Sequence, residues 1–200
     1  AVGFNAMALN TTGASNTAFG AEALVASTTG VSNVAVGKGA LTALTTAAYN
    51  TAIGTSTLQG ITTSSANTAV GYTALLNGNR ANNVAVGFEA LRQGASGNSN
   101  VAVGYVALTT NTGAQNTAVG HNSMKFNTSG TQNVAVGAFA LDANTTADDN
   151  TAVGHNCLTA NTTGTGNTAV GRKAMDLTTT GGNNVAIGKE ALRVNQTGFN

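Results

Sequence analysis

The stretch NTAVGHNCLTANTTGTGNTAVG, from Asn150 to Gly171, contains the pentapeptide Asn-Thr-Ala-Val-Gly twice, 17 residues apart. Related pentapeptides recur along the entire chain, and their glycines are Gly3, Gly20, Gly37, Gly54, Gly71, Gly87, Gly104, Gly120, Gly137, Gly154, Gly171 and Gly188. The spacing is 17 residues throughout, except for two steps of 16 that end at Gly87 and Gly120. A short fixed period of this kind is typical of a solenoid, in which each unit buries its apolar face against the next.

The composition excludes several classes of partner. Charged residues make up 8% of the chain, against about 25% in an ordinary soluble domain. The net charge is +1, which gives no electrostatic basis for binding nucleic acid or an anionic membrane. No apolar run approaches the length of about 20 residues that crosses a bilayer. We therefore expect no nucleic-acid partner and no direct membrane insertion of this segment.

Four columns of apolar residues stand at fixed offsets from the repeated glycine. The residue two before it is alanine in every repeat, and the residue directly before it is valine, isoleucine or, once, phenylalanine. The third residue after the glycine is small, and the fourth is leucine or methionine. Cys157 stands in the small-residue column, so we expect a buried, inert thiol there. β-branched residues bounded by asparagine and glycine are typical of short strands.

These columns predict an all-β parallel β-solenoid of twelve coils. We expect each coil to contain a strand over the Asn-Thr/Val-Ala-Val segment, a corner at the glycine, a second short strand over the Ala-Leu pair and a return loop. Both 16-residue repeats lose their residue in that loop, at 76–82 and 109–115, which indicates that it faces solvent. We interpret residues 1–200 as a single repeat array and expect it to be a segment of a longer fibre protein.

An asparagine stands four residues before the glycine in every repeat from Asn16 to Asn184, and Asn200 continues the series. Identical amides stacked about 4.8 Å apart can hydrogen-bond along the column as a ladder. Alternatively, asparagine suits a left-handed or turn conformation at this position. Both interpretations are structural, and neither implies a ligand.

The apolar columns on both sides of each strand indicate an oligomer. Neighbouring side chains of a strand point to opposite faces. If the valine and leucine columns fill the interior, with Val136 and Leu141 as examples, the alanine columns lie on the surface. Extended apolar columns on a surface usually mark an interface. We therefore expect the alanine columns to pack against another copy of the chain.

The stretches Asn33-Val34-Ala35-Val36-Gly37 and 184–188 resemble the NSVAIG motif of YadA-like head repeats in trimeric autotransporter adhesins. The longer unit, Gly-x-x-Ala-Leu followed by Asn-Thr-Thr-Gly, resembles repeats of phage tail-fibre and related "tail fiber domain" surface proteins. The resemblance covers all the repeats, although the period of 17 is longer than that of the YadA-like unit. It implies a left-handed β-roll and a parallel homotrimer.

The acidic residues and histidines are too widely spaced for a catalytic or metal site. Glu22, Glu89 and Glu190 share one column but lie four and six coils apart. At about 4.8 Å per coil they are about 19 Å or more apart, which is too far for paired carboxylates. His121 and His155 lie two coils apart in a column that we expect to face solvent, and one metal ion cannot bridge them within a chain. We predict no enzyme activity, no metal and no cofactor.

A stripe of aromatic residues in the column directly after the glycine is the candidate binding surface. It consists of Phe4, Tyr72, Phe88 and Tyr105, interspersed with basic residues and histidines. Such a stripe suits a host-surface glycan or a protein receptor. The alternative interpretation is that amphipathic side chains merely cover the strand edges.

The sequence as a whole favours a structural or adhesive fibre segment. Every recurring feature serves stacking of the chain on itself, and arrays of this kind lengthen by adding units. We expect a rigid shaft or head that is extracellular, on a cell surface or part of a virion fibre, and that projects or forms a host-binding element. The alternative is an ice-binding β-solenoid, but its flat threonine array is interrupted here, because valine replaces threonine in five strands.

Overall fold

The structure is a computed structural model that describes residues 1–78, 80–93, 97–195 and 198. Regular structure in these residues consists of eleven strands of three residues each. They are β1 (Thr17–Phe19), β2 (Val34–Val36), β3 (Thr51–Ile53), β4 (Thr68–Val70), β5 (Val84–Val86), β6 (Val101–Val103), β7 (Thr117–Val119), β8 (Val134–Val136), β9 (Thr151–Val153), β10 (Thr168–Val170) and β11 (Val185–Ile187).

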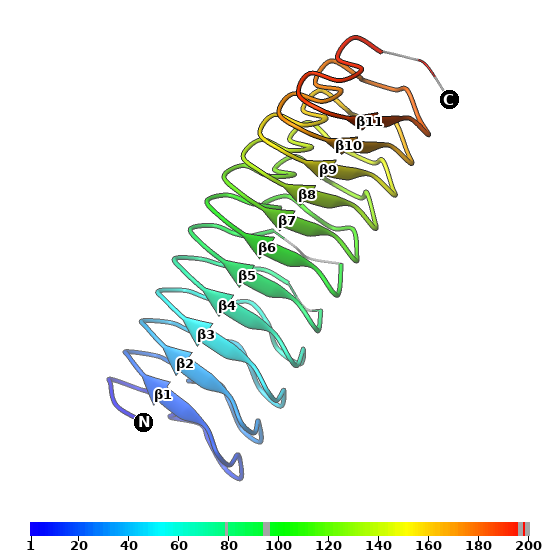
Figure 1. The fold of residues 1–200 in the computed structure, drawn as a ribbon. Coiled ribbons are helices and arrows are strands. Elements are labelled where there is room, and N and C mark those ends of the chain that lie inside the picture. The colour runs from blue at the N-terminus through cyan, green and yellow to red at the C-terminus, as the bar shows by residue number, and fades with distance from the viewer. Residues whose placement is uncertain (79, 94–96, 196–197, 199–200) are drawn as a thin grey trace.

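The strands form one parallel sheet in which each strand pairs with the next along the chain (Figure 1). The chain thus makes ten complete turns from β1 to β11, and Val2 adds an isolated parallel bridge before β1. The 16-residue repeats keep the register, because Ala69 pairs with Ala85 and Ala102 pairs with Ala118. Their missing residue is therefore absorbed outside the strands. The predicted parallel β-solenoid is confirmed.

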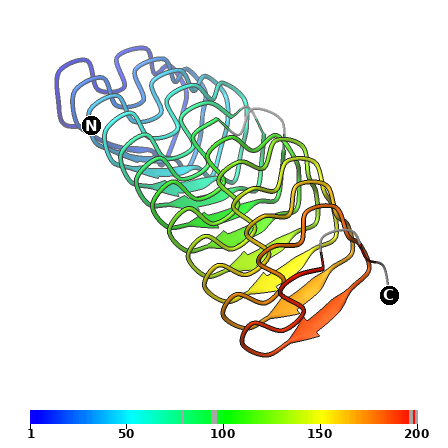
Figure 2. The ribbon, with the colours of Figure 1, turned by 90° about the horizontal axis from the view of Figure 1, so that it is seen from above.

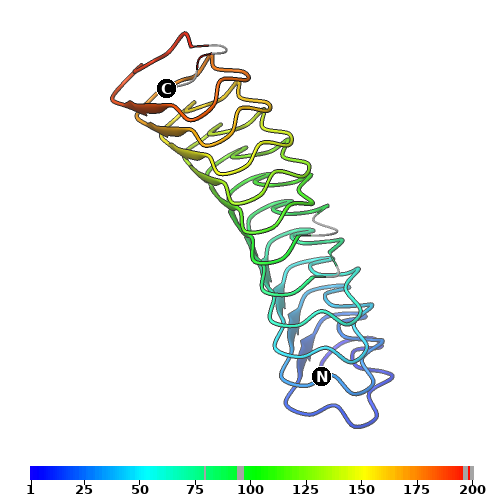
Figure 3. The ribbon, with the colours of Figure 1, turned by 90° about the vertical axis from the view of Figure 1, so that its right-hand side faces the viewer.

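The coils stack into an elongated rod with the two termini at opposite ends (Figure 2). The strands follow one another along a single wall of the rod, and the turns that connect them form the rest of the cross-section (Figure 3). The sheet wall is therefore a continuous surface that runs the length of the rod.

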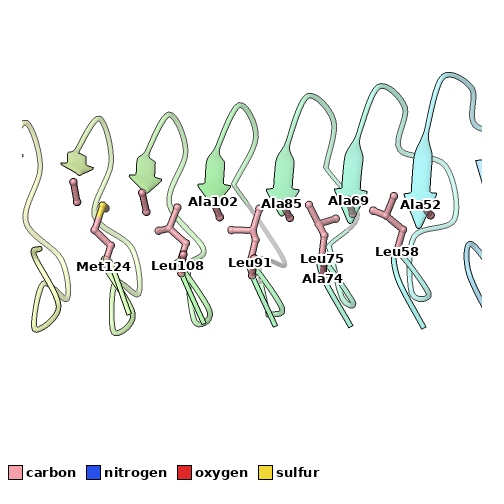
Figure 4. Close-up of a cluster of buried hydrophobic side chains, with 14 of the residues drawn as sticks. Ala52, Leu58, Ala69, Ala74, Leu75, Ala85, Leu91, Ala102, Leu108 and Met124 are labelled. Atoms are coloured by element: carbon pink, nitrogen blue, oxygen red, sulfur yellow. The ribbon is translucent and has the colours of Figure 1, made fainter. Parts of the chain in front are cut away.

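The core lies between the sheet and the wall opposite it. The middle alanine of every strand is buried, and so is the leucine or methionine of the opposite wall from Leu24 to Met175. Figure 4 shows Leu58, Leu75 and Leu91 extending toward the alanines of the strands. The core is thus a layer of long side chains from one wall against methyl groups from the other.

The predicted division between inside and outside is wrong for the strands. Ala135 has no exposed surface, whereas the neighbouring Val136 is 37% exposed. The opposite wall already fills the gap with leucine, so that the sheet side has room only for a methyl group. The alanine columns are therefore interior, and the valine column faces outward.

The second predicted strand, over the Ala-Leu pair, is also wrong. The leucine has a left-handed backbone, with φ values of 54° at Leu41 and 50° at Leu141. A left-handed residue breaks the alternation of a strand, and Ala140 and Leu141 are accordingly both buried. The wall is still bonded from coil to coil, because the Leu41 N–H donates to the Thr57 carbonyl at 3.1 Å. The wall opposite the sheet is therefore a stack of turns, hydrogen-bonded from coil to coil, and not a second set of strands.

The repeated glycine makes a corner that no other residue fits. Gly137 has φ 136°, and a Cβ added there would lie 2.5 Å from the carbonyl oxygen of Gly154 in the next coil. The conformation and the close approach of the backbone both require glycine. This explains why the glycine recurs in every repeat.

The asparagine column forms a buried ladder, which confirms one of the two predicted roles. Asn133 donates its backbone N–H and its Nδ2 to Oδ1 of Asn116, at 3.0 and 3.1 Å. Asn150 donates in the same way to Asn133, at 3.0 and 3.3 Å. The Nδ2 of Asn133 also donates to the Ala147 carbonyl at 2.8 Å. No asparagine of this column within the described ranges has a positive φ, and Asn200 lies outside them.

A second asparagine ladder, not predicted from the sequence, lies beside the first, and Asn116 Nδ2 donates to Oδ1 of Asn111 at 3.4 Å between the two. The Nδ2 of Asn127 donates to Oδ1 of Asn111 at 2.6 Å, and Asn144 donates to Asn127 at 2.8 Å. Asn161 continues the series onto Asn144 at 3.4 Å. The signal was present as a spacing of 16 or 17 residues between these asparagines. The two ladders satisfy polar groups that would otherwise be costly to bury.

Candidate functional site

The outer face of the sheet is the largest uniform surface that the repeats create. The first and third side chains of each strand are exposed or half-buried, while the middle one is buried. Every one of these outward residues is threonine, valine, isoleucine or phenylalanine. Ile53 is 41% exposed and Val153 is 36% exposed. The face is therefore an uncharged strip along the rod, and its apolar members are mainly valines, with two isoleucines and one phenylalanine, and not the predicted alanines.

Three of the four predicted stripe residues come together as stacked rings. The ring centroids of Tyr72 and Phe88 are 5.5 Å apart with an interplanar angle of 16°, and those of Phe88 and Tyr105 are 5.2 Å apart at 9°. His121 continues the series, 5.3 Å from Tyr105 at 10°. We call Tyr72, Phe88, Tyr105 and His121 the aromatic stack. Phe4 lies several coils away and is 73% exposed.

The geometry of the aromatic stack argues against a sugar-binding platform. Sugars bind aromatic side chains through a free ring face, but the rings within the stack turn their faces toward one another. At the far end, Phe139 lies edge-on to His121, with centroids 5.1 Å apart at 68°. Phe139 comes from the next column, so its place beside the stack was not evident from sequence. Tyr72 and Tyr105 are nevertheless 52% and 51% exposed.

The predicted solvent exposure of the histidine column is confirmed, since His121 and His155 are both exposed. Phe139 lies between them, with its centroid 6.1 Å from that of His155. No group of three or more histidine, cysteine, aspartate or glutamate side chains that suits a metal ion occurs among the described residues.

The glutamates of the shared column are surface residues with separate partners. Glu89 lies 3.7 Å from Arg92, and Glu190 lies 3.5 Å from Arg172. Both ion pairs lie at the surface, although Glu89 is half-buried, and surface ion pairs contribute little to stability. Glu22 is exposed. The structure brings no two of these three glutamates together, because they lie in separate coils.

Two titratable groups are perturbed by burial. Desolvation raises the pKa of the half-buried Asp142, while the charges of Lys125 and His121 act in the opposite direction. Burial raises the pKa of the Cys157 thiol from its ordinary value of 9.0 to about 11. Cys157 has no exposed surface, and its Sγ donates to the Ala169 carbonyl at 3.2 Å. The predicted buried thiol is confirmed.

Threonine side chains fasten the coils together along the return loop, a feature that the sequence analysis did not identify. Oγ1 of Thr128 donates to the Thr145 carbonyl at 2.8 Å, and Oγ1 of Thr145 donates to the Thr162 carbonyl at 3.1 Å. The following residue, Thr146, is exposed. The loop therefore has one threonine column that ties the coils and one that faces solvent.

Comparisons with known proteins add no family assignment. No family model, no curated protein and no solved structure matches this chain. Within the described ranges, none of the segments is a helix of the length and hydropathy needed to span a membrane. The surfaces of the solenoid itself are therefore the basis for a functional proposal.

Proposed function

We propose that this chain is a non-enzymatic segment of a structural or adhesive fibre, extracellular, on a cell surface or on a virion. In this proposal the solenoid is a left-handed β-roll of twelve coils that associates side by side as a parallel homotrimer. The resulting rod is rigid and holds a host-binding element away from the surface that carries it. The fibre role and the trimer follow the resemblance to YadA-like head and tail-fibre repeats.

The observation that supports this proposal is the uncharged outer face of the sheet. A solenoid that stayed monomeric would expose this strip to water along its whole length, and long apolar strips on soluble proteins usually mark interfaces. The core of an interface between subunits is packed as densely as a protein interior. Side chains such as Val136 and Val153, each about one-third exposed, suit that packing.

Sedimentation velocity at micromolar concentration tests the assembly. We expect a trimer for the unmodified chain and a monomer for the double variant Val103→Asp, Val136→Asp, because each carboxylate would be desolvated at the interface. The matched control is Thr146→Asp on the exposed loop, which should remain trimeric. A monomeric unmodified chain would contradict the proposal.

The proposed location is tested by imaging the native source with a label at Thr146. We expect regularly spaced label along thin projecting fibres. A diffuse or cytoplasmic label would contradict the fibre role.

Ice binding is the second candidate function. Threonine occupies the first outward position of six strands, so the interrupted threonine column noted in the sequence lies on the outer face of the sheet. Valine replaces it in β2, β5, β6, β8 and β11, and a near-isostere that lacks the hydroxyl suits packing better than ordered water. Thermal hysteresis or faceted ice crystals at sub-millimolar protein would reverse this ranking.

We do not assign the host receptor, whether glycan or protein, to the aromatic stack. Its inner ring faces are covered, and Phe4 is separate from it. In our proposal this segment supplies length, rigidity and self-association.

A further inference from the structure

The outer face of the sheet repeats so closely that it defines axial register poorly. Sliding one copy along another by one coil, about 4.8 Å, replaces each outward residue with a threonine, valine, isoleucine or phenylalanine of the next strand. Register is weakly specified wherever a surface repeats in this way, and assemblies correct it with a few distinctive residues. A trimer built on this face therefore needs an aperiodic feature.

One region of the outer face differs from the rest. Of the eleven strands, β5 and β6 are the only neighbouring pair with valine at both outward positions. Their side chains Val84, Val86, Val101 and Val103 form what we call the valine patch. Threonine resumes on both sides, at Thr68 in β4 and Thr117 in β7.

The aromatic stack lies at the same axial level as the valine patch. Phe88 follows β5 and Tyr105 follows β6, each directly after the corner glycine. Tyr72 and His121 stand in the same place after β4 and β7. Phe88 is 41% exposed and Tyr105 is 51% exposed, although both rings are stacked. The order Tyr-Phe-Tyr-His thus runs beside Thr-Val-Val-Thr at the first outward positions of the four strands.

We infer that the aromatic stack of one copy packs on the valine patch of the adjacent copy and fixes the axial register of the oligomer. This inference rests on the proposed self-association. In a parallel ring two different surfaces of neighbouring copies meet at the same level. The in-register contact places Phe88 on valine and the polar rings of Tyr72 and His121 beside threonines.

A shift of one coil disrupts this match in either direction. His121 would face Val134 after a shift one way and Val101 after a shift the other way, in place of Thr117. A polar ring edge that loses its hydroxyl neighbour and is covered by valine loses hydrogen bonding to water without compensation. The in-register arrangement is the one that avoids this loss.

The area of the interface also favours a contribution from the aromatic stack. Three residues per strand and eleven strands give the sheet face a width of about 10 Å and a length of about 50 Å, or about 500 Å². A stable interface buries about 800 Å² on each partner. Exposed aromatic side chains at the corner beside the sheet widen the contact and are enriched at interface cores.

Disulfide trapping between two single-cysteine chains tests this inference. Both chains carry Cys157→Ala; one has Val153→Cys in β9, and the other has cysteine at position 134, 151 or 168. The two are unfolded and refolded together, then oxidised. A disulfide requires Cα atoms about 4.4–6.8 Å apart, so that a slip of one coil changes the partner. For the otherwise unmodified chain we expect one of the three positions to dominate.

Two sets of substitutions should spread the disulfide over neighbouring positions. One replaces Tyr72, Phe88 and Tyr105 with threonine, the residue that Thr55 supplies in the same column. The other is Val84→Thr with Val101→Thr, which makes β5 and β6 like the threonine strands. We expect the ratio of dominant to neighbouring disulfide to fall about tenfold, as a loss of about 1.4 kcal/mol of register preference would produce. The matched control, Val34→Thr with Val185→Thr, should leave the ratio unchanged.

Each remaining outcome overturns the inference in a distinguishable way. An oligomer whose disulfide ratio is unchanged in both sets of variants shows that the stack does not set register, while the proposed self-association stands. An oligomer with no disulfide at any of the three positions has its interface elsewhere on the rod. A monomeric unmodified chain removes the proposed self-association and this inference together.

Discussion

The inner and outer faces of the same strands follow different rules. On the inner face alanine is invariant, whereas the outer face accepts threonine, valine, isoleucine and phenylalanine. Ala135 is fully buried beside Val136, which is 37% exposed. The smaller apolar residue is thus interior and the larger one exterior, because leucine from the opposite wall fills the core. Side-chain size, set by the space across the core, decides which face a residue occupies.

Aspartate substitutions at a buried position and at an outward-facing position should differ most in their effect on the free energy of unfolding. Leu141→Asp places a carboxylate where the side chain has no exposed surface, so we expect a loss of about 4 kcal/mol or more in the free energy of unfolding. Val136→Asp should cost the isolated chain less than about 1.5 kcal/mol, since its side chain reaches water. Urea denaturation of monomeric material measures both. Equal losses would show that the valine column is buried within the coil.

The inner polar ladder should show the next largest effect. Asn133→Ala removes the Nδ2 bonds to Asn116 and Ala147, and it takes away the Oδ1 that accepts from the N–H and Nδ2 of Asn150. Each lost bond costs about 1 kcal/mol, and a buried unsatisfied group costs more, so we expect a loss of about 2–4 kcal/mol.

The control for this prediction is Asn16→Ala. Asn16 is the first asparagine of the ladder and is only half-buried, so its loss should be less than half as large. Similar losses at the two positions, measured by urea denaturation, would contradict the view that the ladder is a cooperative inner element.

The strand wall was predictable from sequence, because its residues obey ordinary strand rules. β-branched residues, an invariant alanine and a bounding glycine indicated a three-residue strand in each repeat, and the 17-residue period indicated parallel stacking. The ladder at Asn133 followed from the same period. Periodicity identifies columns, but it does not say which of two apolar columns faces inward. That choice depends on the wall across the core, which the sequence did not reveal.

The opposite wall was not predictable, because it departs from local preference. Leucine is rarely left-handed, so nothing in the Ala-Leu pair indicates φ 50° at Leu141. The candidate stripe was predicted only in part for a related reason. A shared column brings Tyr72, Phe88 and Tyr105 near one another, but stacked rings and splayed rings have the same sequence pattern.

The buried thiol of Cys157 should make the stability of the chain depend on pH. Its pKa is raised from 9.0 to about 11 in the folded chain, so between these values the folded state keeps a proton that the unfolded state loses. The stabilising contribution is complete below pH 9 and is lost as pH rises toward 11. We expect the unmodified chain to lose about 2 kcal/mol more than Cys157→Ala between pH 8 and pH 10.5. Equal losses in urea denaturation would indicate a solvated thiol.

The residues with a left-handed backbone occur both in the core and at the surface, and substitutions at the surface position should have the smallest effect on stability. At Leu141 packing in the core compensates for the strain, but Gln132 is exposed with φ 58° and has no such compensation. Asn82 and Asn183 occupy the equivalent position in other coils, with φ 63° and 57°. Asparagine tolerates this conformation better than other non-glycine residues, so Gln132→Asn should raise the free energy of unfolding by about 0.5 kcal/mol. Gln132→Val, β-branched and equally exposed, should lower it by about 1 kcal/mol. If thermal and urea denaturation gave the two variants the same stability, backbone strain at this exposed position would not limit the stability of the coil.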